Sequence, residues 1–227
     1  MVIGEQISII QTILKNNHQS TRYPDSLVYS LIKDARAELL RQSAEASKNI
    51  SKFNWQTVCF SLTKTTDIYE CDCFEGDCVL LQTTALPPTI SKNGKPLLKV
   101  MTFSGKQIPY THLTRVSDLK HYKHLKDKVV YTLVNNKITI FNTTLLKCVI
   151  VEAVFEDPLE LDGVVNADVD GNSTTDCAYD KNTFDFPMDA NLSRIVREMV
   201  YRELISSYKL PQDAGNDGRD IRSKTDI

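Results

Sequence analysis

The chain has 227 residues, 41% hydrophobic and 25% charged, which suits one large or two small globular domains. Its 27 basic and 29 acidic residues nearly cancel, and this balance argues against a general nucleic-acid coat protein. No apolar stretch approaches the roughly 20 residues of a membrane helix, and the first residues lack the pattern of a secretory signal, so we expect a soluble globular chain.

Two amphipathic helices are predicted near the N-terminus. In residues 5–15, two isoleucines and a leucine recur at i, i+3 and i+7, with polar residues between them. After a polar linker, Asp25 or Ser26 is expected to cap a longer helix that runs to about Ser47.

The longer helix is expected to bury one apolar row and to expose its charges. The expected row is Leu27, Leu31, Ala35 and Leu39, with Val28 and Ile32 beside it. The charges expected to point to solvent are Lys33, Arg36, Glu38 and Arg41. Its Ala-rich end has high helix propensity but a weak apolar face, so this end is predicted to project from the body.

From Asn54 the apolar period changes to two, which predicts half-buried strands. Asn93-Gly94 and Asn135-Asn136 each separate two apolar runs and are typical of hairpin turns, because Gly and Asn tolerate positive φ. A long β-branched strand is predicted for residues 147–155, and a short helix for residues 116–125. The regularly spaced turns favour a compact sandwich or barrel over βαβ units.

The C-terminal third of the chain predicts a loop, a helix and a tail. Residues 157–185 are acidic, rich in small polar residues and without periodicity, which indicates a long loop. Asp189 or Asn191 is expected to cap a helix with a broad apolar face, and Pro211 ends it. Residues 211–227 are polar and would not fold alone.

Together these elements predict an α+β fold, in which a helical N-terminal hairpin and a C-terminal helix surround a compact antiparallel β sandwich or barrel module. A polar arm follows the last helix. The expected divisions are N-terminal helices 1–50, a β-rich module 51–157, an acidic loop 158–188, a C-terminal helix 189–210 that packs with the N-terminal helices, and an arm 211–227.

Charge is unevenly distributed along the chain. Residues 92–128 hold nine Lys and Arg against two Asp, a local net charge of +7, whereas residues 156–189 carry a local net charge of −9. This asymmetry favours surfaces that face different partners or that pair head to tail between copies. The alternative is that both segments are solvated loops, because salt screens exposed charges beyond about 8 Å.

A cysteine cluster invites a zinc interpretation that its spacing does not support. Cys71, Cys73 and Cys78 could supply thiolates, and His121 and His124 could supply nitrogens. A second Cys-x-x-Cys or His pair is missing, and nothing brings these histidines near the cysteines. We therefore expect reduced cysteines that serve as small apolar residues on strands.

No cofactor is expected, and the chain is not expected to be an enzyme. The loop Asp168–Asp176 has alternating oxygen ligands like a calcium loop, but Ser173 stands where a Gly is needed and Tyr179 where a bidentate Glu is needed. The sequence has no phosphate loop, no nucleophile elbow and no pair of acids at a catalytic spacing, so no catalytic, cofactor-binding or metal residues are assigned.

The order of elements, with three sequence runs, resembles a known family. The runs are V-I-V-E-A-V-F-E-D-P at 149–158, N-L-S-R-I-V-R-E-M-V at 191–200 and L-P-Q-D-A-G-N-D-G-R-D at 210–220. Within them, F-E-D-P and N-D-G are the short motifs that carry the likeness. The chain resembles the head-to-tail connector (portal adaptor or ring) proteins of short-tailed bacteriophages, and most closely those of crAss-like phages.

The resemblance implies a structural virion protein at the head–tail junction, assembled in the cytoplasm of the host bacterium. By family analogy twelve copies would form a ring beneath the portal, extend the DNA channel and present a surface to the next tail ring or tube protein. Packaged DNA would pass through without sequence-specific contact, and no membrane would be bound. The candidate portal contacts are Leu210, Pro211, Arg219 and Arg222; the alternative is a solvated chain end.

Two other functions stay open. A free-standing β-rich module that binds carbohydrate or peptide would use the same strands but would need an exposed aromatic platform. Aromatic residues make up 8% of the chain, with a single Trp, which weakens this alternative. A metal-binding protein would use the cysteine cluster or the loop Asp168–Asp176.

Overall fold

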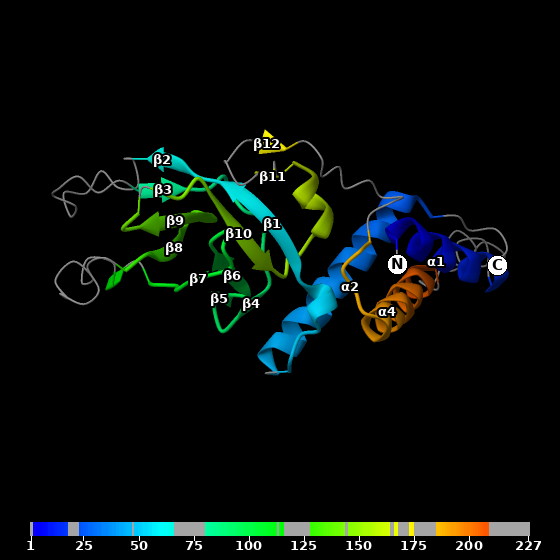
Figure 1. Cartoon of the computed structure of the whole chain (residues 1–227). Helices are drawn as coiled ribbons and strands as arrows, with labels where there is room; N and C mark the ends of the chain where they lie inside the picture. The colour runs from blue at the N-terminus through cyan, green and yellow to red at the C-terminus, as the bar shows by residue number, and fades with distance from the viewer. Residues whose placement is uncertain are drawn as a thin grey trace, which may run out of the picture.

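The computed structural model describes residues 2–17, 23–46, 48–65, 80–112, 114–115, 128–143, 145–163, 166–167, 173–174 and 185–208. Helices gather at one end and antiparallel sheets at the other, and the long helix α2 (Asp25–Glu45) reaches from the helical end toward the sheets (Figure 1). The structure therefore confirms the predicted α+β class.

The helical body is formed by α1 (Ile3–Asn17), the first half of α2 and α4 (Ala190–Tyr208). Their apolar faces meet in one core, whose most buried side chains are Ile3, Ile10, Val28, Ile32 and Val200. Because amphipathic helices in proteins gain most of their stability from tertiary packing, mutual burial of these apolar faces stabilises all three helices.

The helix starts agree with expectation at α4 and differ at α2. The Asp189 carboxylate accepts a hydrogen bond from the Leu192 N–H at 2.8 Å, which confirms Asp189 as the cap of α4. At α2, Pro24 occupies the cap position and provides no side-chain hydrogen bond, so neither Asp25 nor Ser26 caps this helix. Proline suits this place because its fixed φ directs the chain into the helix while its missing N–H costs nothing there.

In the described residues, the β module is built around two four-stranded antiparallel sheets. In spatial order, the first sheet is β1 (Gln56–Ser61), β10 (Cys148–Ala153), β6 (Leu98–Met101) and β7 (Gln107–Ile108). The second is β2 (Thr63–Thr65), β3 (Leu80–Gln82), β9 (Lys137–Phe141) and β8 (Val130–Val134). Both sheets contribute side chains to one core, and they do not close into a barrel. The module is therefore a sandwich, one of the two predicted forms.

Both predicted hairpins are confirmed. Asn93 and Gly94, with φ of 51° and 73°, join β4 (Ser91–Lys92) to β5 (Lys95–Pro96). Asn135 and Asn136, with φ of 50° and 59°, join β8 to β9. Paired positive φ values are the geometry whose twist matches that of two antiparallel strands, which explains why Asn and Gly occupy these turns.

The described parts of the acidic segment contain short regular elements that the loop prediction did not include. It contains the 3₁₀ helix η2 (Pro158–Gly163) and the strand pair β11 (Asn166–Ala167) and β12 (Ser173–Thr174). Periodicity could not reveal elements this short, because they span less than one full repeat of any pattern. The helix predicted for residues 116–125 lies entirely outside the described residues.

Candidate functional site at the junction of helices and sheets

The buried row of α2 differs from the expected one by a single position. The most continuous buried row is Val28, Ile32, Arg36, Leu40 and Ala44, at intervals of four residues. Val28 and Ile32 were expected beside the apolar row, and Ala35 of the expected row is buried as well. Leu27, expected to lead the buried row, is 42% exposed. Two neighbouring rows of this helix are apolar, so periodicity alone does not decide which one faces the core.

Arg36 is the largest departure from expectation. It was expected to point to solvent, but its side chain is 0% exposed. Its Nη1 donates to the Phe155 carbonyl at 2.8 Å and, at 3.4 Å, to the Glu156 carbonyl, and its Nε donates to the Pro187 carbonyl at 3.0 Å. Its Nη2 donates to the Asn54 carbonyl at 3.5 Å. One guanidinium thus joins α2 to the chain before β1, after β10 and before α4.

Arg36 keeps its charge inside the protein. Burial lowers the pKa of Arg36 to about 10, and the nearby Tyr29 and Asp157 oppose that shift, so the guanidinium remains protonated at neutral pH. The guanidinium carbon also lies 5.6 Å from the centroid of the Phe186 ring. Carbonyl oxygens and an aromatic face replace the water that the cation has lost.

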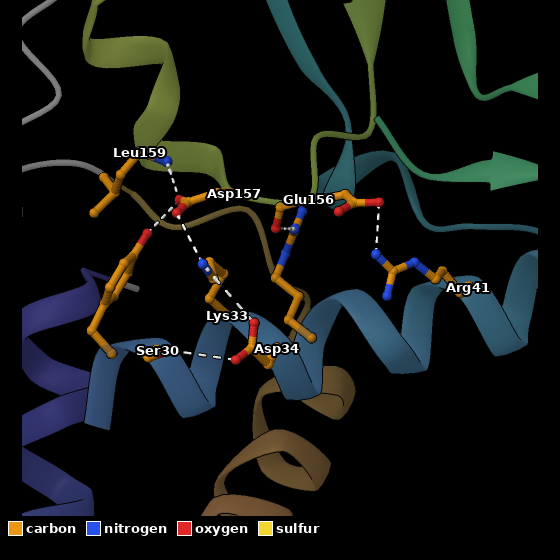
Figure 2. Close-up of polar contacts among 9 residues, drawn as sticks. Ser30, Lys33, Asp34, Arg41, Glu156, Asp157 and Leu159 are labelled. Carbon is orange, nitrogen blue, oxygen red and sulfur yellow. Dashed lines mark hydrogen bonds and ion pairs between the residues drawn. The ribbon is translucent and has the colours of Figure 1, made fainter. Parts of the chain in front are cut away.

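The motif F-E-D-P forms the other half of the junction (Figure 2). Phe155 is buried in the sandwich core, and Glu156 makes an ion pair with Arg41 of α2 at 2.7 Å. Asp157 turns toward the earlier part of α2, where its carboxylate accepts a hydrogen bond from the Tyr29 hydroxyl at 2.5 Å. The motif of the resemblance therefore has a structural role, since its consecutive side chains fasten the end of the sandwich to α2.

The Asp157 carboxylate contacts three groups. Besides the Tyr29 hydroxyl, it accepts the backbone N–H of Leu159 at 2.9 Å and lies 3.8 Å from the Lys33 ammonium. Burial and the Asp157 carboxylate both raise the pKa of Tyr29, so its phenol stays a neutral donor. These contacts set the start of η2 against α2.

The Ala-rich end of α2 packs on the sandwich and does not project. Ala37, Leu40 and Ala44 share a buried cluster with Ile90, before β4, and Val154, after β10. Alanine side chains let the helix backbone come close to the sheet, so a face that looks weak in sequence still excludes water. The prediction that this end projects is wrong, because helix periodicity does not show how close a partner surface can come.

Part of the charge asymmetry is neutralised within the chain. Glu156 and Asp157, both in the acidic segment, pair with Arg41 and Lys33 of α2. In the basic segment, Lys99 pairs with Glu152 at 2.9 Å across β6 and β10. Fewer charges are therefore available to partners than the local net charges of the two segments suggest.

The site residues expected from sequence lie outside the described residues. These are Leu210, Pro211, Arg219 and Arg222 of the arm. The cysteine cluster Cys71, Cys73 and Cys78, the histidines His121 and His124, and most of the loop Asp168–Asp176 lie outside them as well. Within the described ranges no three His, Cys, Asp or Glu residues gather as a metal site.

The two cysteines in the described part of the chain are apolar strand residues. Cys59 on β1 is half-buried and Cys148 on β10 is buried.

Helices of the described part are too short or too polar to cross a bilayer.

Sequence reasoning missed Arg36, although one signal was present. The residue stands four positions from both Ile32 and Leu40, inside an apolar row that continues on either side of it. A charged residue inside such a row is buried only if it finds hydrogen-bond partners. Those partners are backbone carbonyls from three distant segments, and no sequence pattern brings them together.

The sequence is similar to known phage proteins. The profile of a family described as phage tail ring protein 2 matches residues 5–222, which takes in both halves of the junction. A curated relative, ring protein 2 of Bacteroides phage crAss001, is 24% identical over 226 residues, and the alignment covers 97% of each chain. The chain therefore belongs to the phage tail ring protein 2 family, a family of structural phage proteins and not a known class of enzymes.

Proposed function

We propose that copies of this chain form a closed ring beneath the portal of a short-tailed phage, where the ring connects head to tail and extends the DNA channel. Family membership over residues 5–222 carries the proposal. Twelve copies are proposed by analogy with connector rings, and the ring would be part of the virion after assembly in the host cytoplasm. Packaged DNA would pass through it without sequence-specific contact.

The junction supports this role because a ring closes only when every subunit holds the same shape. A cyclic ring repeats one heterologous contact, and a small change of angle within each subunit would leave the ring open. Here the helical body and the sandwich are joined by the buried hydrogen bonds of Arg36 and by the packed end of α2. A buried polar network of this kind permits one relative arrangement of the parts it joins.

We further propose that the C-terminal arm reaches the portal. Leu210 and Pro211 would make its apolar contacts, and Arg219 and Arg222 its charged ones. The arm follows α4, which ends at Tyr208 in the helical body. A segment that orders on binding can wrap a large surface, and repetition around a ring multiplies a weak contact into a lasting one.

The test is assembly with the cognate portal. The chain and purified portal would be mixed, sized by light scattering and imaged by negative stain. We expect a ring on one end of the portal. Removal of residues 209–227 should abolish portal binding while circular dichroism of the isolated chain stays unchanged, and Arg219→Ala with Arg222→Ala should weaken binding. A full-length chain that remains monomeric and never decorates the portal contradicts the proposal.

A further inference from the structure

The outer face of α1 carries a shallow groove of about 550 Å³. Its lining residues in the described part of the chain are Val2, Gly4, Glu5, Ser8 and Ile9. The inner face of α1 is buried in the helical body, so the groove belongs to a second, outward face of the helix. Gly4 and Ser8, one turn apart, have little side-chain volume, and Val2 and Ile9 offer apolar surface.

A matching protrusion lies elsewhere on the chain. Phe53 is 76% exposed at the middle of the 3₁₀ turn η1 (Lys52–Asn54). The turn is firmly held, because the Trp55 N–H donates to the Lys52 carbonyl at 3.1 Å and Asn54 is buried. An aromatic ring on a fixed turn loses little conformational freedom when it enters a pocket, which is the property of interface anchor residues.

The groove and the turn have complementary charge. Glu5 lines the groove, whereas Lys52 adjoins Phe53 in the turn and Lys48 precedes it; all three side chains are exposed. Within the described residues, neither Glu5 nor Lys52 forms an ion pair. Leu145 is more exposed, at 89%, but it lacks the aromatic surface of an anchor residue.

We propose that Phe53 of one copy enters the α1 groove of the next copy, with Lys52 beside Glu5 of that neighbour. The inference rests on the proposed ring, because a ring needs two different faces on each subunit that fit each other. Figure 1 shows α1 at the helical end and the turn, drawn in cyan after α2, toward the sheets. The two features lie on different elements, α1 and η1, and can serve as the two sides of one heterologous contact.

Two variants and one control test the contact in the full chain with its portal. Phe53→Asp removes the anchor and Ile9→Asp places a charge in the groove; each should weaken ring formation by about 30-fold or more. Phe103→Asp, at a 47% exposed aromatic outside both features, is the matched control and should form rings like the wild type. Circular dichroism and the thermal midpoint verify that each variant is folded.

Charge reversal provides a milder second test. Glu5→Lys or Lys52→Glu alone should weaken assembly by about three- to tenfold, because each replaces an attraction by a repulsion at the edge of the contact. The double variant restores the attraction with its sign reversed and should assemble within about threefold of the wild type. Failure of the double variant to recover contradicts the pairing.

Mixing Phe53→Asp with Ile9→Asp tests the direction of the contact. The first variant keeps an intact groove and the second an intact anchor, so together they should form dimers that cannot extend to rings. If all variants form rings equally well, the proposed contact between Phe53 and the groove is wrong, but the proposed ring is not contradicted. Rings that form but no longer bind the portal would assign the groove to the portal and overturn the inference, and a wild-type chain that forms no ring would overturn both proposals.

Discussion

Replacing Arg36 with Lys tests whether the shape of the guanidinium, and not its charge alone, holds the two parts together. In the wild type, two different nitrogens donate to the Phe155 and Pro187 carbonyls at 2.8 and 3.0 Å. Lysine keeps the charge but has one nitrogen on a shorter reach, so it cannot occupy both donor positions. The buried charge would remain while at least one buried carbonyl loses its donor.

The expected change in stability follows from the lost hydrogen bond to this carbonyl. A hydrogen bond from a charged donor contributes about 1.5–3 kcal/mol, and an unpaired buried carbonyl costs about 1–3 kcal/mol. The two figures partly describe the same lost hydrogen bond and cannot simply be added. We therefore expect Arg36→Lys to lower the free energy of unfolding by about 2–4 kcal/mol. Arg41→Lys is the matched control: its side chain is 43% exposed and its ion pair with Glu156 is expected to contribute less than about 1 kcal/mol.

Urea denaturation monitored by two probes measures the effect. Circular dichroism follows the helices, and fluorescence follows Trp55, the single Trp, which lies at the junction in the cluster with Leu40 and Ala44. Lowered stability for Arg36→Lys, with little change for Arg41→Lys, supports the argument. An Arg36→Lys protein within about 0.5 kcal/mol of the wild type would show that one nitrogen suffices, and the geometric reasoning would then be wrong.

Three further predictions concern stability. Tyr29→Phe removes one donor from Asp157 and should lower the free energy of unfolding by about 1–2 kcal/mol in urea; an unchanged midpoint would contradict a role for this hydrogen bond. Burial raises the pKa of Tyr131 to about 12, so between pH 10 and 12 its phenol is protonated in the folded state but ionised in the unfolded chain. The free energy of unfolding should therefore fall by about 2–3 kcal/mol as pH rises from 10 to 12. Alkaline titration of Tyr131→Phe should show a smaller loss, with Tyr201→Phe as control, and equal losses in the wild type and Tyr131→Phe would refute the assignment. Gly94→Ala should cost about 1 kcal/mol in thermal unfolding from its φ of +73° alone, because nothing lies within 4 Å of an added Cβ; no cost would mean that the turn relaxes.

One helix, α2, couples the helical body to the sandwich. α2 contributes its first half to the helical body and its second half to the cluster beneath the sandwich. We expect variants that loosen Arg36 to weaken ring formation even where the isolated helices and sheets remain folded.

Local patterns in the sequence determined the class of the fold and most of its elements. Helical spacing predicted the N-terminal helices and the C-terminal helix, and Asn93-Gly94 and Asn135-Asn136 predicted both hairpins, because these signals depend on residues close together in the chain. Asp189 was identifiable as a cap for the same reason.

Tertiary structure alone decided which face of α2 is buried and what its charges contact. The carbonyls bound by Arg36 come from residues 18 to 151 positions away in sequence, and the choice between two apolar rows depends on the surfaces that pack against them. A guanidinium is stable inside a protein only where distant chain segments converge to replace its water. That convergence is a property of the complete fold, which is why Arg36 looks like a surface residue in the sequence and is the centre of the junction in the structure.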